Sequence, residues 1–554
     1  MRALIVIAAV LIAASGSAQE VDVEAIARAI RTEALRSNDD PAGRALPLAG
    51  HWNTGHYPRA RGMDPAFEIG LIEQGHYVLP SFHHQPYWHQ GWAGVGEKYY
   101  GAAIRKPAKL RLPLTFLGTQ WERGLTDDKH YFAMPPEKNP NVVTPDGKIL
   151  KKVSPFGPVE IWREVGRKWT ATPALRKLQE QYHDPPLVIF LSNNEHAKLR
   201  WHQAETSKRY LDKHGKGKSD DFKRKLVGAG WIERYRALQA GMRDGLTAPA
   251  WKQNAIFVGY EAFGPAHFGR WGGWKEYSLI IKGRVTPWPL AWDGGTPSYY
   301  VHNWNPSTDY TVWSPHVESN NWLFMLDESW KLNPKFWWEL SVWDGYQPKL
   351  ANCMRKTYAK RGQKYGPERY RGFVQFGMWL MRPRVVREFR GWTDDVKTMM
   401  PYYKEILRSV DLVHRNDLLK AFWRKGKLVP NRAHKHPYQQ NIPDEYRDVD
   451  RWFLLDTNLT PKRPWKLKTE IPVWAMALVM GEPPKCTWLV YAQSPLKHRE
   501  NVKVSLPGFG EIATDVTVGG SFYVVDEAKT TGQRLAALRN RGFFAPAKQG
   551  EQGR

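Results

Sequence analysis

Two glutamates, each in a short apolar run, are the residues of this sequence best suited to chemistry. Glu195 ends the run that begins at Leu187, and Glu339 lies in the run from Phe336 to Asp344. Each run is typical of a buried strand that carries a carboxylate at or near its C-terminal end, where catalytic groups of a (β/α)₈ barrel stand. Two carboxyl groups roughly 5 Å apart would hydrolyse a glycosidic bond with retention, one as nucleophile and the other as acid/base. The alternative for each glutamate is a structural salt bridge at a strand end.

A repeated order of apolar strand, polar loop and helical stretch predicts the elements that position these groups. Such alternation is typical of parallel βα units, and eight units favour a closed TIM barrel over an open sheet. We therefore expect a (β/α)₈ catalytic barrel over residues 19–430. Within this range, a short amphipathic helix at 21–35 is expected before the first strand. The expected strands are residues 46–50, 77–82, 114–118, 187–195, 255–260, 298–304, 336–344 and 372–377.

The sequence changes character after the predicted barrel. Residues 431–448 are polar and rich in Pro and His, which indicates a linker. Beyond it, apolar runs at 474–480, 487–492, 502–508 and 521–525 are separated by turn residues without helical stretches between them. This pattern predicts a small antiparallel β-sandwich domain over residues 449–554, with a flexible tail from Ala545 and without a catalytic group of its own.

The pair Asn194-Glu195, followed by Glu339 three predicted βα units later, resembles clan A of the retaining glycoside hydrolases. The resemblance covers roughly residues 45–420. Its motifs are short, so the resemblance depends on their order and their positions in the predicted strands. It implies that Glu195 is the acid/base, that Asn194 holds the sugar 2-hydroxyl near the nucleophile, and that Glu339 is the nucleophile.

The same resemblance implies further contacts. Tyr300 or His302 near strand six would contact the nucleophile, and Trp379 after strand eight would form a platform for a sugar ring. The chain departs from the clan near strand two, where an Arg is common and His83 and His84 stand instead.

Other polar and aromatic residues follow predicted strands and would line the same mouth. Trp52 and Trp121 offer indole faces suited to sugar rings. His83, His84 and His89 could bind substrate or a metal, but the sequence has no HExxH or comparable metal-ligand spacing. We expect neither a metal nor a cofactor. A purely structural role is the further alternative for these three histidines. Glu261 is the rival catalytic acid, and Asp344 is expected to cap a loop.

The charge balance of the chain indicates an acidic partner. The 554 residues contain 81 Lys and Arg against 55 Asp and Glu, a net charge of +26, and 27 Trp. Nucleic acid, an anionic membrane surface and an anionic polysaccharide would all suit this charge, and it could also serve only solubility. Arg123, Arg270, Arg382 and Arg384 follow predicted strands, so we expect a positive mouth that binds sulfate or carboxylate. A basic tract at 208–218 is expected to be a solvated helix end.

The N-terminus predicts export. Residues 1–18 have a basic Arg2, an apolar stretch and small residues before a cleavage point, as in a signal peptide. We therefore expect a secreted or periplasmic protein without a membrane span. Two cysteines, Cys353 and Cys486, make no disulfide framework, and the sequence does not predict an oligomeric state.

The function predicted from these features is hydrolysis of a polysaccharide, plausibly a sulfated or uronic-acid one. Two alternatives stay open: a non-catalytic glycan-binding protein on a degenerate barrel, and a polysaccharide lyase using a Tyr, His and Arg set. A nucleic-acid binder is disfavoured because the chain has a secretion signal and no recognition motif.

Overall fold

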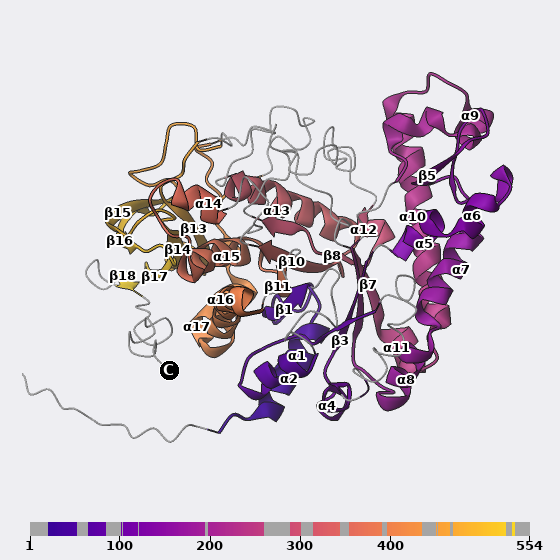
Figure 1. Ribbon diagram of the computed structural model, residues 1–554. Helices are drawn as coiled ribbons and strands as arrows, with labels where there is room; N and C mark the ends of the chain where they lie inside the picture. The colour runs from indigo at the N-terminus through magenta and orange to yellow at the C-terminus, as the bar shows by residue number, and fades with distance from the viewer. Residues whose placement is uncertain are drawn as a thin grey trace, which may run out of the picture.

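The computed structural model describes residues 20–52, 65–84, 101, 103–119, 121–193, 198–259, 288–300, 314–343, 354–389, 396–434, 450, 452–465, 469–527 and 535–537. Within them the chain forms three regions: a parallel barrel, a helical lobe on one side of it, and an antiparallel β domain on the other (Figure 1).

The barrel is the expected one, with eight parallel strand positions in a nearly closed ring. Parallel pairs give the strand order β1-β11-β10-β8-β7-β6-β3-β2, and β9 also pairs with β10. The ring is brought together by a parallel bridge between Ala49 and Val78, just before β2. The strands are β1 Leu48–Trp52, β2 Ser81–His83, β3 Leu114–Thr119, β6 Val188–Asn193, β7 Ala255–Gly259, β8 Gly294–Gly295 with β9 Ser298–Tyr300, β10 Trp337–Trp343 and β11 Val385–Phe389.

Helices cover the outer face of this ring. The predicted N-terminal helix is present as α1, whose Asp22 caps the first turn by accepting from the Ala25 amide. The helices around the barrel are α1 Val23–Leu35, α2 Pro65–Glu73, α4 Arg105–Lys109, α11 Pro249–Asn254, α12 Trp288–Ala291, α13 Ser314–Leu332, α14 Met354–Ala359, α15 Pro367–Met381, α16 Val396–Arg415 and α17 Asp417–Lys425.

The lobe is built from the segments that follow strands three and four of the barrel. Its two main helices pack so closely that glycine is required at the contact: a Cβ added to Gly241 would lie 1.8 Å from the Arg163 carbonyl oxygen. The lobe comprises η1 Trp121–Arg123, α5 Gly124–Asp127, α6 Lys129–Ala133, η2 Pro136–Lys138, β4 Asn141–Val143, β5 Ile149–Val153, α7 Val159–Thr170, α8 Pro173–Gln181, η3 Trp201–Thr206, α9 Lys208–His214 and α10 Asp220–Gly245.

The predicted strand at 372–377 is wrong, because this segment lies inside helix α15. The helix begins at Pro367 directly after Gly366, and it is buried from Tyr370 to Met381 because the barrel covers one side and the β domain another. A helix buried on all sides has a continuous apolar run, as a buried strand has. The true eighth strand, β11, contains Arg387 and Glu388, which interrupt its apolar pattern.

The C-terminal domain is antiparallel, as expected. One sheet has the order β12-β13-β14-β17-β18 and the other pairs β15 with β16, with a shared core that includes Val490 and Val504. Its first strand, β12, precedes the predicted linker. The strands are β12 Lys427–Leu428, β13 Trp474–Met480, β14 Thr487–Gln493, β15 Arg499–Leu506, β16 Gly510–Val516, β17 Ser521–Asp526 and β18 Leu535–Ala537.

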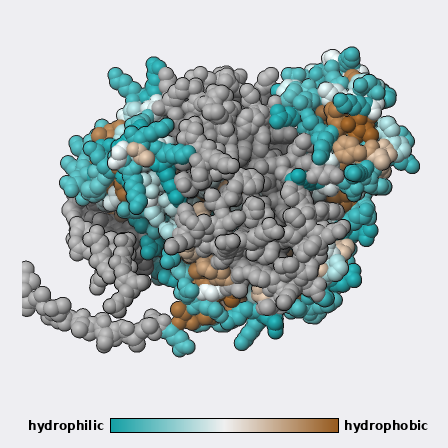
Figure 2. Space-filling model, in the orientation of Figure 1, coloured by the Kyte–Doolittle hydropathy of each residue, from teal (hydrophilic) through white to brown (hydrophobic). Residues whose placement is uncertain are grey.

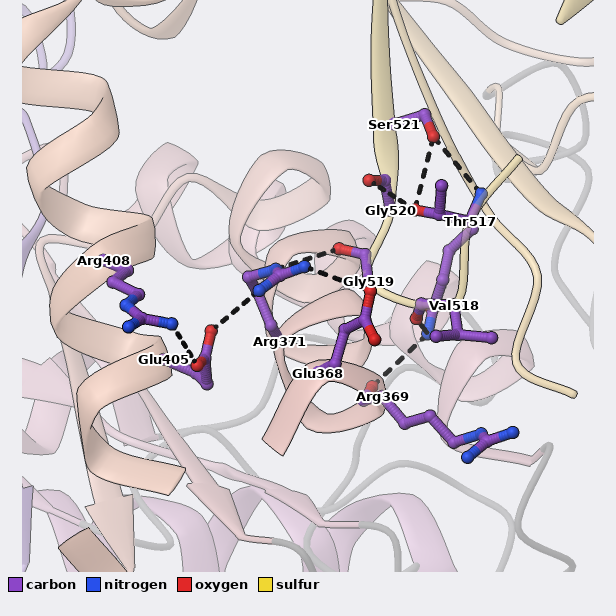
Figure 3. A network of polar contacts seen from close by, with 11 residues as sticks. Glu368, Arg369, Arg371, Glu405, Arg408, Thr517, Val518, Gly519, Gly520 and Ser521 are labelled. Atoms are coloured by element: carbon purple, nitrogen blue, oxygen red, sulfur yellow. Dashed lines mark hydrogen bonds and ion pairs between the residues drawn. The ribbon is translucent and has the colours of Figure 1, made fainter. Parts of the chain in front are cut away.

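This domain is fastened to the barrel through helix α15. Arg371 of α15 binds Glu405 of α16 at 3.1 Å and donates to the Gly519 carbonyl of the sandwich (Figure 3). The Tyr491 hydroxyl donates to the Gly372 carbonyl at 2.7 Å. The sandwich therefore shields one flank of the barrel, and its outer surface is largely hydrophilic (Figure 2).

Among the described residues, no helix is both long enough and apolar enough to cross a membrane. The predicted signal peptide, residues 1–18, lies outside the described residues.

Candidate functional site in the barrel

Glu339 lies in the interior of the barrel, well below the end of its strand. It is the third residue of β10, which continues to Trp343. Four residues of strand separate it from that end, roughly 13 Å at about 3.3 Å per residue. Its side chain has no exposed surface. The prediction that Glu339 lies at the mouth is therefore wrong. The strand continues beyond Glu339 to Trp343, and its apolar pattern continues with it.

Both oxygens of the Glu339 carboxylate are engaged by donors. Arg387 Nε donates to Oε2 at 2.5 Å and Arg387 Nη2 donates to Oε1 at 2.9 Å. The Trp337 indole also donates to Oε1 at 2.8 Å. A bidentate guanidinium and an indole fix the direction of this carboxylate.

Arg387 spans the barrel interior from β11. Besides Glu339, its guanidinium donates at 3.3 Å to the hydroxyls of Ser81 on β2 and Thr115 on β3. Gly50 on β1 makes room for it, since a Cβ there would lie 3.0 Å from Arg387 Nη1. The sequence did not predict this interior arginine, because strand eight was expected at residues 372–377 rather than at β11.

A layer of aromatic rings lies above this ion pair, toward the C-terminal ends of the strands. Tyr300 stacks on Phe389 at 5.0 Å, and Trp343 meets Phe389 edge-on at 5.4 Å. Trp52 pairs in register with Phe389 and Trp343 with Tyr300, so these last strand residues share the interior face. Each of the four is more than nine-tenths buried. Trp52 and Tyr300 therefore end the barrel interior, and the Tyr300 hydroxyl lies 3.1 Å from Ser341 Oγ rather than against Glu339.

The predicted acid/base falls just beyond the end of strand four. The described part of β6 ends at Asn193, which pairs with Thr119. Asn194 and Glu195 follow directly, and they lie outside the described residues, as does His302. The predicted 5–6 Å separation of the two glutamates thus stays a prediction.

The register sets a limit on that prediction. Thr115, which Arg387 contacts, pairs with Ile189, four residues before Asn193. The guanidinium of Arg387 therefore lies beside the lower part of β3 and β6, at the level of Ile189.

The two histidines of strand two have different positions. His83 is the last residue of β2, and its backbone pairs with Leu117. His84 contacts the lobe: its Nε2 lies 3.0 Å from the Trp169 carbonyl oxygen, and its ring meets the Trp169 indole edge-on. Burial lowers the pKa of His84 to about 4, so it is neutral at pH 7 and Nε2 donates to the carbonyl. A contact of either residue with substrate stays a prediction.

Two predicted sugar platforms are core residues instead. Trp121 packs against Trp169 and Trp292, with centroid distances of 5.6 and 5.5 Å, in the layer between barrel and lobe. Trp379 lies in α15 between Trp423 and Phe522, at 5.2 and 5.5 Å. Neither lines the mouth, because a 3₁₀ turn places Trp121 on the outer face and helix α15 covers the outside of the barrel.

The expected arginine mouth is not formed by Arg382 and Arg384. Both precede β11 and therefore lie at the N-terminal end of the barrel. Arg382, at φ 46°, donates to the carbonyls of Trp423 and Gly426, and Arg384 stacks 4.8 Å over the Trp337 ring. Burial lowers the pKa of Arg384 to about 10. Arg123 ends the 3₁₀ turn η1, and Arg270 lies outside the described residues.

A second buried ion pair stands beside the segment that carries Glu195. Lys198 Nζ lies 3.2 Å from Glu122, and neither side chain is more than 1 % exposed. The Tyr235 hydroxyl of α10 donates to the same carboxylate at 2.8 Å. Glu122 and Lys198 thus join the loops after strands three and four, a role that isolated charges in the sequence do not reveal.

In the part of the chain that the structure describes, no group of three or more His, Cys, Asp or Glu side chains could hold a metal ion. Cys486 is a buried free thiol, and Cys353 lies outside the described residues.

Comparison of the chain with protein-family models and with curated protein sequences found no match. The fold defines the chain as a TIM-barrel-like (β/α)₈ protein with a C-terminal antiparallel β-sandwich domain. The resemblance to the clan A glycoside hydrolases stays a prediction.

Proposed function

We propose that the protein is an exported glycoside hydrolase that cleaves a polysaccharide at the C-terminal mouth of the barrel, with Glu195 as acid/base. The observation that carries this proposal is that strand four, β6, belongs to the parallel barrel up to Asn193, which pairs with Thr119 of β3. Asn194 and Glu195 are the next two residues of the sequence, and the catalytic groups of this fold class come from the carboxyl ends of such strands. Fold alone would not support a reaction class.

The proposal reassigns Glu339. A carboxylate nucleophile needs an oxygen that reaches the anomeric carbon of the sugar. The carboxylate of Glu339 has three donors and lies beneath the rings of Trp343 and Phe389. We assign it to the interior ion pair that holds strands seven and eight together.

The deciding experiment measures new reducing ends on a panel of neutral, sulfated and uronic-acid polysaccharides. Glu195→Gln should lower kcat by about 10²–10⁴-fold with little change in KM, because it removes a general acid while leaving the binding groups. Glu137→Gln, on the exposed surface of the lobe, is the matched control and should keep full activity. Equal activity of the two variants would disprove the assignment of Glu195.

The alternative of a non-catalytic glycan-binding barrel is favoured by one observation: the only carboxylate described at the centre of the barrel interior, Glu339, is fully engaged. That alternative predicts depletion of a glycan from solution without cleavage by the wild-type protein. A lyase would instead release products with the ultraviolet absorbance of an unsaturated end.

A further inference from the structure

A cluster of positive charge lies where the barrel meets the sandwich. Between residues 354 and 371 the chain has seven basic residues and one acidic residue, Glu368. This segment comprises α14, the following turn and the first part of α15. It lies beside the turn between β14 and β15 of the sandwich. Lys497 and His498 of this turn and Arg499, the first residue of β15, are three further basic residues.

Arg369 joins these two segments. Its guanidinium donates to the Lys364 carbonyl at 2.5 Å on one side, and to the carbonyls of Pro495 and Leu496 at 3.0 and 2.9 Å on the other. It also stacks 4.9 Å over the Tyr358 ring, whose hydroxyl donates to the Pro495 carbonyl. These contacts therefore hold the segments of Lys364 and Lys497 side by side, although the two lysines are 133 positions apart in the sequence.

The acids nearby are already paired. Arg361 forms an ion pair with Glu470, Arg371 with Glu368, and His498 lies 3.8 Å from Glu500. Lys360, Lys364 and Lys497 are exposed, and among the described residues no ion pair is formed by any of the three. We call these three residues the seam lysines.

We propose that the seam lysines bind an anionic polysaccharide outside the barrel mouth. Lysine ammonium groups are compact point charges on flexible stems, which suits a repeating sulfate or carboxylate better than a single shaped ligand. The site deepens the proposed function, on which it rests, because it would hold a charged polymer beside the barrel while the mouth acts on it. The proposed hydrolysis of a polysaccharide favours a glycan over nucleic acid as the anionic polymer at this site.

The test uses the full mature protein and two triple variants of equal charge. The seam triple is Lys360→Gln, Lys364→Gln and Lys497→Gln. The control triple removes the same charge from the lobe, at the exposed Lys213, Lys216 and Lys218. Affinity is measured for dextran sulfate, polygalacturonate and neutral dextran, and far-ultraviolet circular dichroism confirms that each variant is folded.

The seam triple should bind dextran sulfate or polygalacturonate about tenfold more weakly, because exposed ion pairs contribute roughly 1.5- to 5-fold each. The control triple should change affinity less than twofold, and neutral dextran should not respond to either. The loss should vanish at about 1 M salt, where the Debye length falls to about 3 Å. Equal losses in both triples would show that net charge alone attracts the polymer and would overturn the site.

Equally tight binding of a DNA oligonucleotide or of anionic phosphatidylserine vesicles through the seam lysines would overturn the assignment to a glycan. Failure of the proposed hydrolysis is distinguished from failure of the site by a short neutral oligosaccharide. Its cleavage depends on Glu195 and should be the same in the wild type and the seam triple.

Discussion

Breaking the ion pair between Glu339 and Arg387 should destabilise the barrel strongly. Both side chains are fully buried, and the guanidinium binds both carboxylate oxygens. Removing one partner of such a pair leaves the other charge buried without compensation, at a cost of about 3–5 kcal/mol. We therefore expect Glu339→Leu and Arg387→Met each to lower the free energy of unfolding by this amount.

The double variant, Glu339→Leu with Arg387→Met, shows how much of each loss comes from leaving one charge buried without its partner. With both charges replaced by apolar groups of similar size, the cost should be well below the sum of the two single costs, since no charge is left behind. Some cost remains, because the Trp337 indole and the hydroxyls of Ser81 and Thr115 lose their partners. Urea unfolding followed by tryptophan fluorescence measures all four proteins. Single losses below about 1 kcal/mol, or additive losses, would refute the coupled buried pair.

The same site has a chemical test. If Glu339 were the nucleophile, azide would restore turnover of an activated aryl glycoside by Glu339→Ala, because the small anion would occupy the vacated space and attack the anomeric carbon. We expect no rescue, since Arg387 and the aromatic layer separate this position from the mouth. Rescue with formation of an inverted glycosyl azide would restore the nucleophile assignment. The wild-type protein, assayed in parallel with the same substrate, is the matched comparison and should not respond to azide.

Two further changes test the described structure. His414 has a pKa lowered to about 3, chiefly by burial, and its Nε2 lies 2.8 Å from the Pro47 carbonyl oxygen. Because its pKa is near 6.5 in the unfolded chain, the unfolded state binds more protons below that pH. Stability should therefore fall by about 2 kcal/mol between pH 7 and 5. Urea unfolding of His414→Gln should show a flatter pH dependence, and an unchanged slope would contradict this account. Gly241→Ala should cost about 1–3 kcal/mol in a thermal or urea melt, because its Cβ would meet the carbonyl of Arg163. Gly70→Ala in α2, with nothing within 4 Å of the added Cβ, should instead stabilise by about 0.5–1 kcal/mol, and equal effects would disprove the close helix contact.

The barrel could be predicted because most of its strands are short runs of β-branched and aromatic residues bounded by turns. The run from Val188 shows how: its outward residues pack on the lobe and its inward residues fill the barrel, so both faces are apolar. Parallel strands buried on both sides have this pattern. The sandwich was predictable for a related reason, since its strands alternate and are joined by turns without helices.

The eighth strand could not be predicted from the same signal. Helix α15 is more apolar than β11 because it is enclosed by the barrel and the sandwich, whereas β11 contains Arg387 and Glu388. Glu388 is buried on the outer side of the barrel, where the Tyr370 hydroxyl of α15 donates to it. Charges that are satisfied only by tertiary partners look like surface charges in a sequence, so β11 resembled a polar segment.

The height of a residue along its strand is a further quantity that periodicity does not give. Alternation shows that Glu339, Ser341 and Trp343 share one face of β10, but it is the same whether the strand ends at Glu339 or four residues later. The register decides: Ser341 pairs with Arg387, and Arg387 reaches Thr115 near the start of β3. A carboxylate at that depth has the side chains of neighbouring strands as hydrogen-bond partners. We therefore propose different roles for two glutamates that the sequence presents as equivalent, Glu195 in the proposed reaction and Glu339 in the barrel that supports it.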